Sequence, residues 1–114
     1  MKILLVDDEP DILEFLGELL EMFNAEVLTA NCGEIAVDKL LADKFDVLVT
    51  DVKMKNGDGM FVLEQIQENK IDLKKIIVMT GYSQYPEEAF YEAGAHVVFQ
   101  KPIDIEKLKE SIFN

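Results

Sequence analysis

Five polar residues that could act together in phosphoryl transfer each lie at the end of a short apolar segment: Asp7, Asp8, Asp51, Thr80 and Lys101. If these segments are parallel strands of one sheet, their carboxyl ends share an edge where ligands bind. Three carboxylates crowded there repel one another unless a cation neutralises them. Oxygen ligands without a nearby His or Cys favour a hard cation such as Mg²⁺. Beside Mg²⁺ and an ammonium group, an Asp carboxylate could then accept a phosphoryl group.

The segments that must position these residues alternate between short apolar runs and longer stretches of helical period. This pattern is typical of repeated strand–helix units and a parallel sheet. We predict strands at residues 2–6, 26–29, 46–50, 75–80 and 97–99. We predict a first helix along the apolar stripe from Ile12 to Phe23, and further helices at residues 34–41, 60–68, 86–93 and 104–112. Pro86 suits the first position of its helix.

The predicted first, third and fourth strands are continuously apolar, as expected of strands with helices on both faces of the sheet. The second and fifth are weaker and suit the edges, which matches the strand order 2-1-3-4-5. We therefore predict an α/β fold, a flavodoxin-like doubly wound five-stranded parallel sheet with five helices. At 114 residues the chain suits one domain over residues 1–114.

The overall charge and the apolar segments exclude several classes of function. The net charge is -12 and the acids are spread along the chain, which argues against direct nucleic acid binding and against binding to an anionic membrane. No apolar stretch approaches the roughly 20 residues of a membrane helix. A single cysteine, Cys32, cannot form an internal disulfide, so a reducing compartment is the simplest assumption. We expect a soluble, cytoplasmic protein.

Taken in order, these motifs closely resemble those of the receiver domains of response regulators in two-component signalling. The matching residues are Asp7-Asp8, Asp51-Val52-Lys53-Met54 followed by Gly59, Thr80-Gly81, and Lys101-Pro102. The resemblance implies that Asp51 is the phosphoacceptor. It also implies that Asp8, Asp51 and the backbone carbonyl of Lys53 ligate Mg²⁺, that Asp7 acts mainly through coordinated water, and that Thr80 and Lys101 contact the phosphoryl oxygens. A cis bond between Lys101 and Pro102 is expected by the same resemblance.

By this resemblance the chain receives its phosphoryl group from a sensor histidine kinase or a phosphotransfer protein. Phosphorylation then changes a surface that binds a downstream protein or output domain. Such a domain is no enzyme in the usual sense, because it catalyses only its own phosphorylation and dephosphorylation. The predicted elements reach Asn114 just after the fifth helix, so we expect no output domain within these residues.

Two alternatives share parts of this pattern. A haloacid-dehalogenase-like phosphatase also uses an Asp nucleophile and Mg²⁺, but its nucleophile follows the first strand in an Asp-x-Asp motif, and here the two acids are adjacent. Turnover of a small phosphate ester would identify it. A phosphorylation-independent interaction module on the same fold would be favoured had Asp51 or Lys101 been replaced, and neither is.

The sequence departs from the family at several positions. Val98 stands where a switching Tyr or Phe is usual, and the ring one residue later, Phe99, should face the opposite side of the sheet. Lys55 replaces a usual Pro. Lys53 and Tyr82 are expected to border the phosphoryl group, and neither can orient a hydrolytic water well, so we predict slow self-dephosphorylation.

Overall fold

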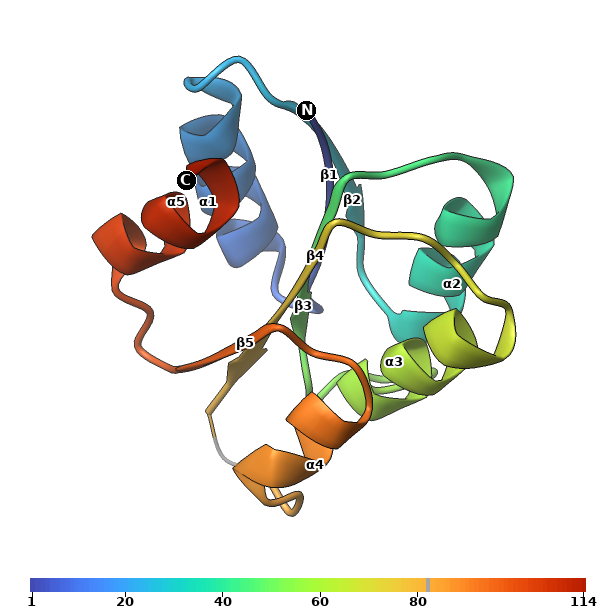
Figure 1. Ribbon diagram of the computed structural model, residues 1–114. Helices are drawn as coiled ribbons and strands as arrows, with labels where there is room; N and C mark the ends of the chain where they lie inside the picture. Colours follow the sequence, from blue (N-terminus) through green and yellow to red (C-terminus); the bar gives the residue numbers. More distant parts are fainter. Residues whose placement is uncertain (82) are drawn as a thin grey trace.

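The computed structural model describes residues 1–81 and 83–114, and its centre is a parallel sheet in the order β2-β1-β3-β4-β5 (Figure 1). The strands are β1 (Lys2–Val6), β2 (Glu26–Ala30), β3 (Val47–Asp51), β4 (Lys75–Thr80) and β5 (Val97–Gln100). The three central strands are almost wholly buried, whereas β2 and β5 are partly exposed at the edges. The predicted strand order is therefore confirmed, with strand bounds within one residue of those expected.

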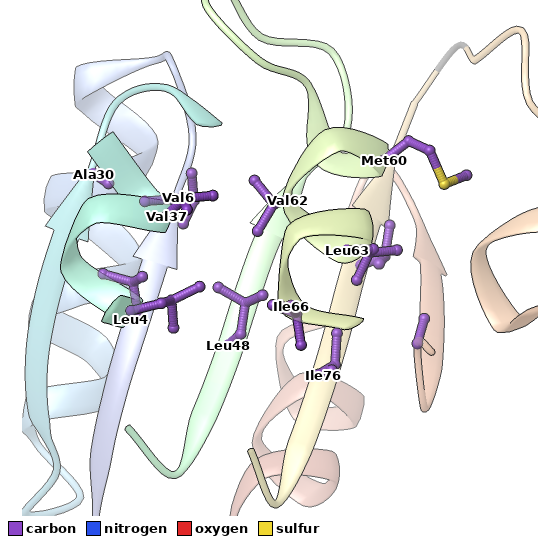
Figure 2. Close-up of a cluster of buried hydrophobic side chains, with 14 of the residues drawn as sticks. Leu4, Val6, Ala30, Val37, Leu48, Met60, Val62, Leu63, Ile66 and Ile76 are labelled. Carbon is purple, nitrogen blue, oxygen red and sulfur yellow. The ribbon is translucent and has the colours of Figure 1, made fainter. Parts of the chain in front are cut away.

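Helices cover both faces of this sheet. On one face lie α1 (Pro10–Glu21) and α5 (Ile105–Phe113), and on the other lie α2 (Gly33–Ala42), α3 (Gly59–Glu68) and α4 (Glu87–Glu92) (Figure 1). Successive strand residues alternate between the faces. Leu4 and Val6 of β1 therefore pack with α2 and α3 (Figure 2), whereas Ile3 and Leu5 pack with α1 and α5.

The helix starts follow local capping chemistry. Asp58 and Asp104 cap α3 and α5, because their carboxylates accept hydrogen bonds from backbone N–H groups of the first turn. Pro10 occupies the first turn of α1, so this helix begins before the predicted Ile12. The prediction that Pro86 is the first helical residue of α4 was wrong. Its ψ of 153° is extended, so Pro86 precedes a helix that begins at Glu87.

Two further observations bear on function. Val98 packs among the side chains on the α2–α4 face and Phe99 among those on the α1–α5 face, so the expected opposite orientation of these two residues is confirmed. Among the described residues, no helix combines the length and apolar character needed to cross a membrane.

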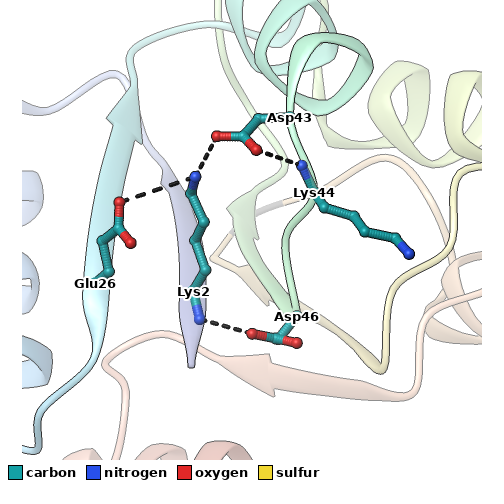
Figure 3. A network of polar contacts seen from close by, with 5 residues as sticks. All are labelled: Lys2, Glu26, Asp43, Lys44 and Asp46. Carbon is teal, nitrogen blue, oxygen red and sulfur yellow. Dashed lines mark hydrogen bonds and ion pairs between the residues drawn. The ribbon is translucent and has the colours of Figure 1, made fainter.

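A network of ion pairs and hydrogen bonds lies at the amino ends of the strands (Figure 3). The Lys2 ammonium pairs with Asp43 and lies 3.9 Å from a Glu26 carboxylate oxygen, and the Lys2 backbone N–H donates to Asp46 at 2.8 Å. The backbone hydrogen bond from Lys2 and the charge of Lys74 lower the pKa of Asp46. Each of these three carboxylates therefore has a lysine ammonium group within 4 Å.

Candidate functional site

The opposite edge of the sheet, at the carboxyl ends of its strands, brings the predicted site residues together. Carboxylate oxygens of Asp7, Asp8 and Asp51 lie within 4.8 Å of one another. A cavity of about 300 Å³ adjoins them, lined by Asp8, Glu9, Asp51, Val52, Lys53, Thr80, Gly81 and Lys101. Residues of β3 and β4 and of the segments that follow β1 and β5 thus share one pocket, as parallel strands require.

Asp7 is fully buried, and hydrogen bonds fix its position. Its backbone N–H donates to the Ala30 carbonyl at 3.2 Å, and its Oδ1 accepts from the Glu9 N–H at 2.9 Å. Its Oδ2 accepts no hydrogen bond within the described part of the chain, and the Lys101 Nζ is 3.5 Å away. An ionised carboxylate in such surroundings needs further positive charge. Asp8, by contrast, is exposed at the mouth of the pocket.

Asp51 is the last residue of β3 and is only 5% exposed. Its Oδ1 accepts from the Val52 N–H at 2.8 Å, and its Oδ2 lies 3.2 Å from the Lys101 Nζ. Burial and the neighbouring Asp7 carboxylate raise the pKa of Asp51, although Lys101 and the Val52 N–H act in the opposite direction. The carboxylate is therefore under electrostatic stress that a further cation would relieve.

Lys101 places an ammonium group beside the Asp7 and Asp51 carboxylates. Its backbone N–H donates to the Thr80 carbonyl at 2.8 Å, which extends the β4–β5 pairing by one step. The expected cis bond between Lys101 and Pro102 is confirmed. Burial lowers the pKa of Lys101, but the carboxylates of Asp51 and Asp7 outweigh it, so the net shift is upward. The side chain therefore carries its charge at neutral pH.

Thr80 ends β4 and is 4% exposed. Its hydroxyl oxygen has no hydrogen-bond partner in residues 1–81 and 83–114. A buried hydroxyl without a partner costs about 1–3 kcal/mol. An oxyanion placed in the pocket would provide the missing acceptor.

The loop of residues 52–58 borders the pocket and is anchored by close backbone contacts. The Gly59 N–H donates to the Val52 carbonyl at 2.7 Å, and a Cβ at Gly59 would lie 2.6 Å from the Asp51 carbonyl oxygen. At the far end of the loop, the Gly33 N–H donates to the Gly57 carbonyl at 3.0 Å. A Cβ at Gly33 would lie only 2.4 Å from that carbonyl oxygen. Glycine at both positions therefore permits the approach that fixes the loop carrying Lys53.

The charge balance of the pocket fits a divalent cation. Three carboxylates meet here, and within the described part of the chain Lys101 is the lysine that forms ion pairs with two of them, Asp7 and Asp51. Their oxygens, which include an Asp7 Oδ2 that accepts no hydrogen bond from the described residues, form the type of donor set that Mg²⁺ prefers. The residues present therefore suit that ion.

Two residues near the site, Asp58 and Tyr85, were not predicted from the sequence. Asp58 caps α3 and also accepts a hydrogen bond from the Tyr85 hydroxyl at 3.0 Å. The Asp58-Gly59 pair before an apolar helix was a readable capping signal, whereas nothing in the sequence pointed to Tyr85. Tyr82, expected beside the phosphoryl group, lies outside the described residues.

Comparison with known proteins gives a consistent result. The family model described as the response regulator receiver domain matches residues 3–113. The transcriptional regulatory protein GlrR of Escherichia coli is 31% identical over 96% of this chain and 25% of its own length. The response regulator MprA of Mycobacterium avium is 36% identical over 95% of this chain and 47% of its own length. The chain thus spans between a quarter and about half of these relatives.

Solved structures agree with the sequence relatives. The response regulator protein TrrA of Thermotoga maritima, in complex with Mg²⁺ and BeF, superposes with a TM-score of 0.86 at 36% identity and covers 97% of this chain and 95% of that one. A CheY-like receiver domain protein of Methanospirillum hungatei has a TM-score of 0.88 at 29% identity, with 97% and 89% covered. The pocket, the strand order and these matches together show that the chain belongs to the receiver domain family of two-component response regulators.

Proposed function

We propose that this receiver domain accepts a phosphoryl group on Asp51 in a Mg²⁺-dependent reaction, and that the modification switches a protein-binding surface. The observation that carries the proposal is the setting of the Asp51 carboxylate, which lies at a strand end between two other carboxylates and the Lys101 ammonium. The structural similarity to TrrA, which was solved with Mg²⁺ and BeF, supports the same assignment.

The proposed ligands of Mg²⁺ are the Asp8 and Asp51 carboxylates and the Lys53 carbonyl, with Asp7 acting through water. When bound, the ion would supply positive charge to the phosphoryl oxygens. A carboxylate oxygen of Asp51 forms a bond to phosphorus while the bond from phosphorus to the donor histidine nitrogen breaks, and the electron pair returns to that nitrogen. No protein proton has to move, because Asp51 reacts as the carboxylate.

Lys101 and Thr80 stabilise the product. The Lys101 ammonium already lies 3.2 Å from the Asp51 carboxylate, so an oxygen on the attached phosphoryl group comes within its reach. The Thr80 hydroxyl, which lacks a partner among the described residues, would donate to another phosphoryl oxygen. These two contacts make the arrangement of the pocket depend on phosphorylation.

The phosphoryl donor in this proposal is a sensor histidine kinase or a phosphotransfer protein in the cytoplasm, and the recipient of the signal is a downstream protein or output domain. The domain turns over no external substrate. The family match does not favour the haloacid-dehalogenase-like phosphatase or the phosphorylation-independent module.

Labelling with a small-molecule phosphodonor tests the proposal. Wild-type protein should acquire a hydroxylamine-sensitive phosphoryl group only when Mg²⁺ is present, and Asp51→Asn should acquire none, because an amide cannot supply the nucleophile. Asp38→Asn is a matched control, since Asp38 is an exposed acid of α2 that does not line the pocket. Equal labelling of Asp51→Asn and wild type would refute Asp51 as the acceptor.

A second variant tests whether Asp8 is a ligand of Mg²⁺. Asp8→Ala should weaken Mg²⁺ binding and slow labelling together, because it removes a hard oxygen ligand from the pocket mouth. Labelling that stays equally fast and equally dependent on Mg²⁺ would contradict the role given to Asp8.

A further inference from the structure

The described residues just before α4, 83–86, contact the loop that borders the phosphoacceptor, and they are called the β4–α4 loop here. The Tyr85 hydroxyl donates a hydrogen bond of 3.0 Å to the Asp58 Oδ2, across 27 positions of sequence. The other oxygen of the same carboxylate, Oδ1, accepts from the Phe61 N–H at 2.8 Å and so caps α3. One Asp58 oxygen thus caps α3 while the other binds the Tyr85 hydroxyl.

The Tyr85 ring is held in place for this contact. It meets the buried Phe90 ring edge-on, with ring centroids 5.7 Å apart. The Tyr85 backbone N–H also donates to the Ser83 hydroxyl at 3.0 Å. A hydrogen bond from a tyrosine to an ionised carboxylate is stronger than one between neutral groups. The contact therefore restrains the β4–α4 loop more firmly than an ordinary loop contact.

Thr80 connects this restraint to the phosphorylation site. Tyr85 follows Thr80 by only five positions, so a short stretch of backbone joins the two residues. The loop has space to move, because a cavity of about 420 Å³ lies beside it, lined in part by Met54, Gln84 and Tyr85. At β5, Val98 offers no ring to follow Thr80, and Phe99 faces the other side of the sheet.

We propose that Tyr85 and Asp58 form a latch that holds the β4–α4 loop, and with it Thr80, in the unphosphorylated arrangement. Engagement of Thr80 with the phosphoryl group requires the Tyr85–Asp58 hydrogen bond to break. The two residues are positioning residues, since they act through Thr80 and touch no reacting atom. This inference rests on the proposed function and adds the contact that sets how strongly the unphosphorylated arrangement is favoured over the phosphorylated one.

If Tyr85 and Asp58 form such a latch, loss of their hydrogen bond should favour the phosphorylated arrangement. Tyr85→Phe keeps the ring against Phe90 and deletes the hydroxyl, so the apparent affinity for beryllofluoride at saturating Mg²⁺ should rise roughly tenfold. The affinity for Mg²⁺ alone should stay within about twofold, because the ion does not require Thr80 to move. A residue with a merely structural role would not produce this split.

Two further variants sharpen the test. Asp58→Asn preserves a good helix cap and weakens the charge-assisted bond, so it should also raise beryllofluoride affinity, and the double variant should bind no more tightly than Tyr85→Phe. Tyr91→Phe is the matched control, because it deletes another hydroxyl of the same region, one that accepts from the Val98 N–H at 3.2 Å. It should leave beryllofluoride affinity unchanged.

Hydrogen exchange without any phosphoryl analogue provides an independent measurement. The amides of residues 83–85 should exchange faster in Tyr85→Phe than in Tyr91→Phe. Unchanged exchange, or an unchanged or weaker beryllofluoride affinity in Tyr85→Phe, overturns the latch while the proposed function stands. A wild-type protein that fails to bind beryllofluoride at saturating Mg²⁺ overturns the proposed function and the role of the latch together.

Discussion

Replacing Asp51 by Asn should stabilise the metal-free protein, although it destroys the proposed acceptor. Asp51 is 5% exposed, and its carboxylate lies within 4.8 Å of two other carboxylates. Burial and the Asp7 charge raise its pKa, which means that the fold disfavours the ionised form of Asp51. An amide of nearly the same shape removes that charge and keeps the packing.

The size of the effect follows from opposing terms. At an effective dielectric constant of about 20, the repulsion between Asp51 and Asp7, within 4.8 Å, is about 3.5 kcal/mol, and exposed Asp8 adds a smaller, screened repulsion. The attraction lost to Lys101, 3.2 Å away, is about 5 kcal/mol by the same formula. The terms with Lys101 and Asp7 differ by about 1.5 kcal/mol in favour of the charged carboxylate, and the repulsion from Asp8 reduces this difference, so relief of the desolvation penalty decides the sign. We expect the free energy of unfolding of metal-free Asp51→Asn to exceed that of wild type by about 1–3 kcal/mol at pH 7.

The assay is urea unfolding of both proteins at pH 7 in the presence of a chelator, then at saturating Mg²⁺. Bound Mg²⁺ should stabilise wild type by about 2.7 kcal/mol at 100 times its Kd, and Asp51→Asn by less, so the advantage of the variant should shrink or reverse. A metal-free Asp51→Asn protein less stable than wild type would refute the electrostatic reasoning.

The pH dependence provides a second check on the same variant. Because the folded-state pKa of Asp51 is raised, the folded protein takes up a proton at a pH where the unfolded chain does not. Wild type therefore gains stability from this group as pH falls through the folded pKa toward the unfolded value of about 3.9. The difference in free energy of unfolding between Asp51→Asn and wild type should be largest at neutral pH and should become smaller on acidification. A difference that widens would contradict the raised pKa.

Three other predictions concern neighbouring residues. Lys101→Ala should leave Mg²⁺ binding largely intact and blunt the structural response to beryllofluoride, because we propose that its ammonium contacts the phosphoryl group; an unaltered NMR response would count against that contact. Replacing Lys53 with Asn and Tyr82 with Glu should shorten the phosphoryl lifetime at similar Mg²⁺ affinity, and phosphate-release time courses that are equal or slower would remove shielding as the cause. Gly33→Ala should weaken Mg²⁺ binding several-fold, because its Cβ would displace a loop carbonyl 2.4 Å away, whereas Gly17→Ala, with no atom within 4 Å, should not; equal affinities by titration calorimetry would contradict this.

The sheet edge could be predicted from the sequence because two local signals coincide there. Continuous apolar runs identify buried parallel strands, and the residue after each run must lie at the carboxyl edge. Asp7 follows β1, Asp51 ends β3 and Thr80 ends β4, so their approach follows from strand order alone. The packing faces of Val98 and Phe99 followed equally from alternation along a strand.

The loop contacts could not be predicted, because they join residues distant in sequence through backbone geometry. Nothing local indicates that Gly33 receives the Gly57 carbonyl, or that the Tyr85 hydroxyl reaches Asp58. Pro86 illustrates a different limit. A proline fixes φ but leaves ψ free, so it fits both the residue before a helix and the first helical residue. Here it precedes the helix.

The proposal that Asp51 carries the phosphoryl group is tested most directly by a pair of crystal structures with and without Mg²⁺ and beryllofluoride. Beryllofluoride should bind an Asp51 carboxylate oxygen, Mg²⁺ should bind Asp8, Asp51 and the Lys53 carbonyl, and Lys101 and Thr80 should lie within hydrogen-bond distance of the fluorides. Beryllofluoride bound at another residue, or an Asp51 carboxylate free of it at saturating concentrations of both, would contradict the claim.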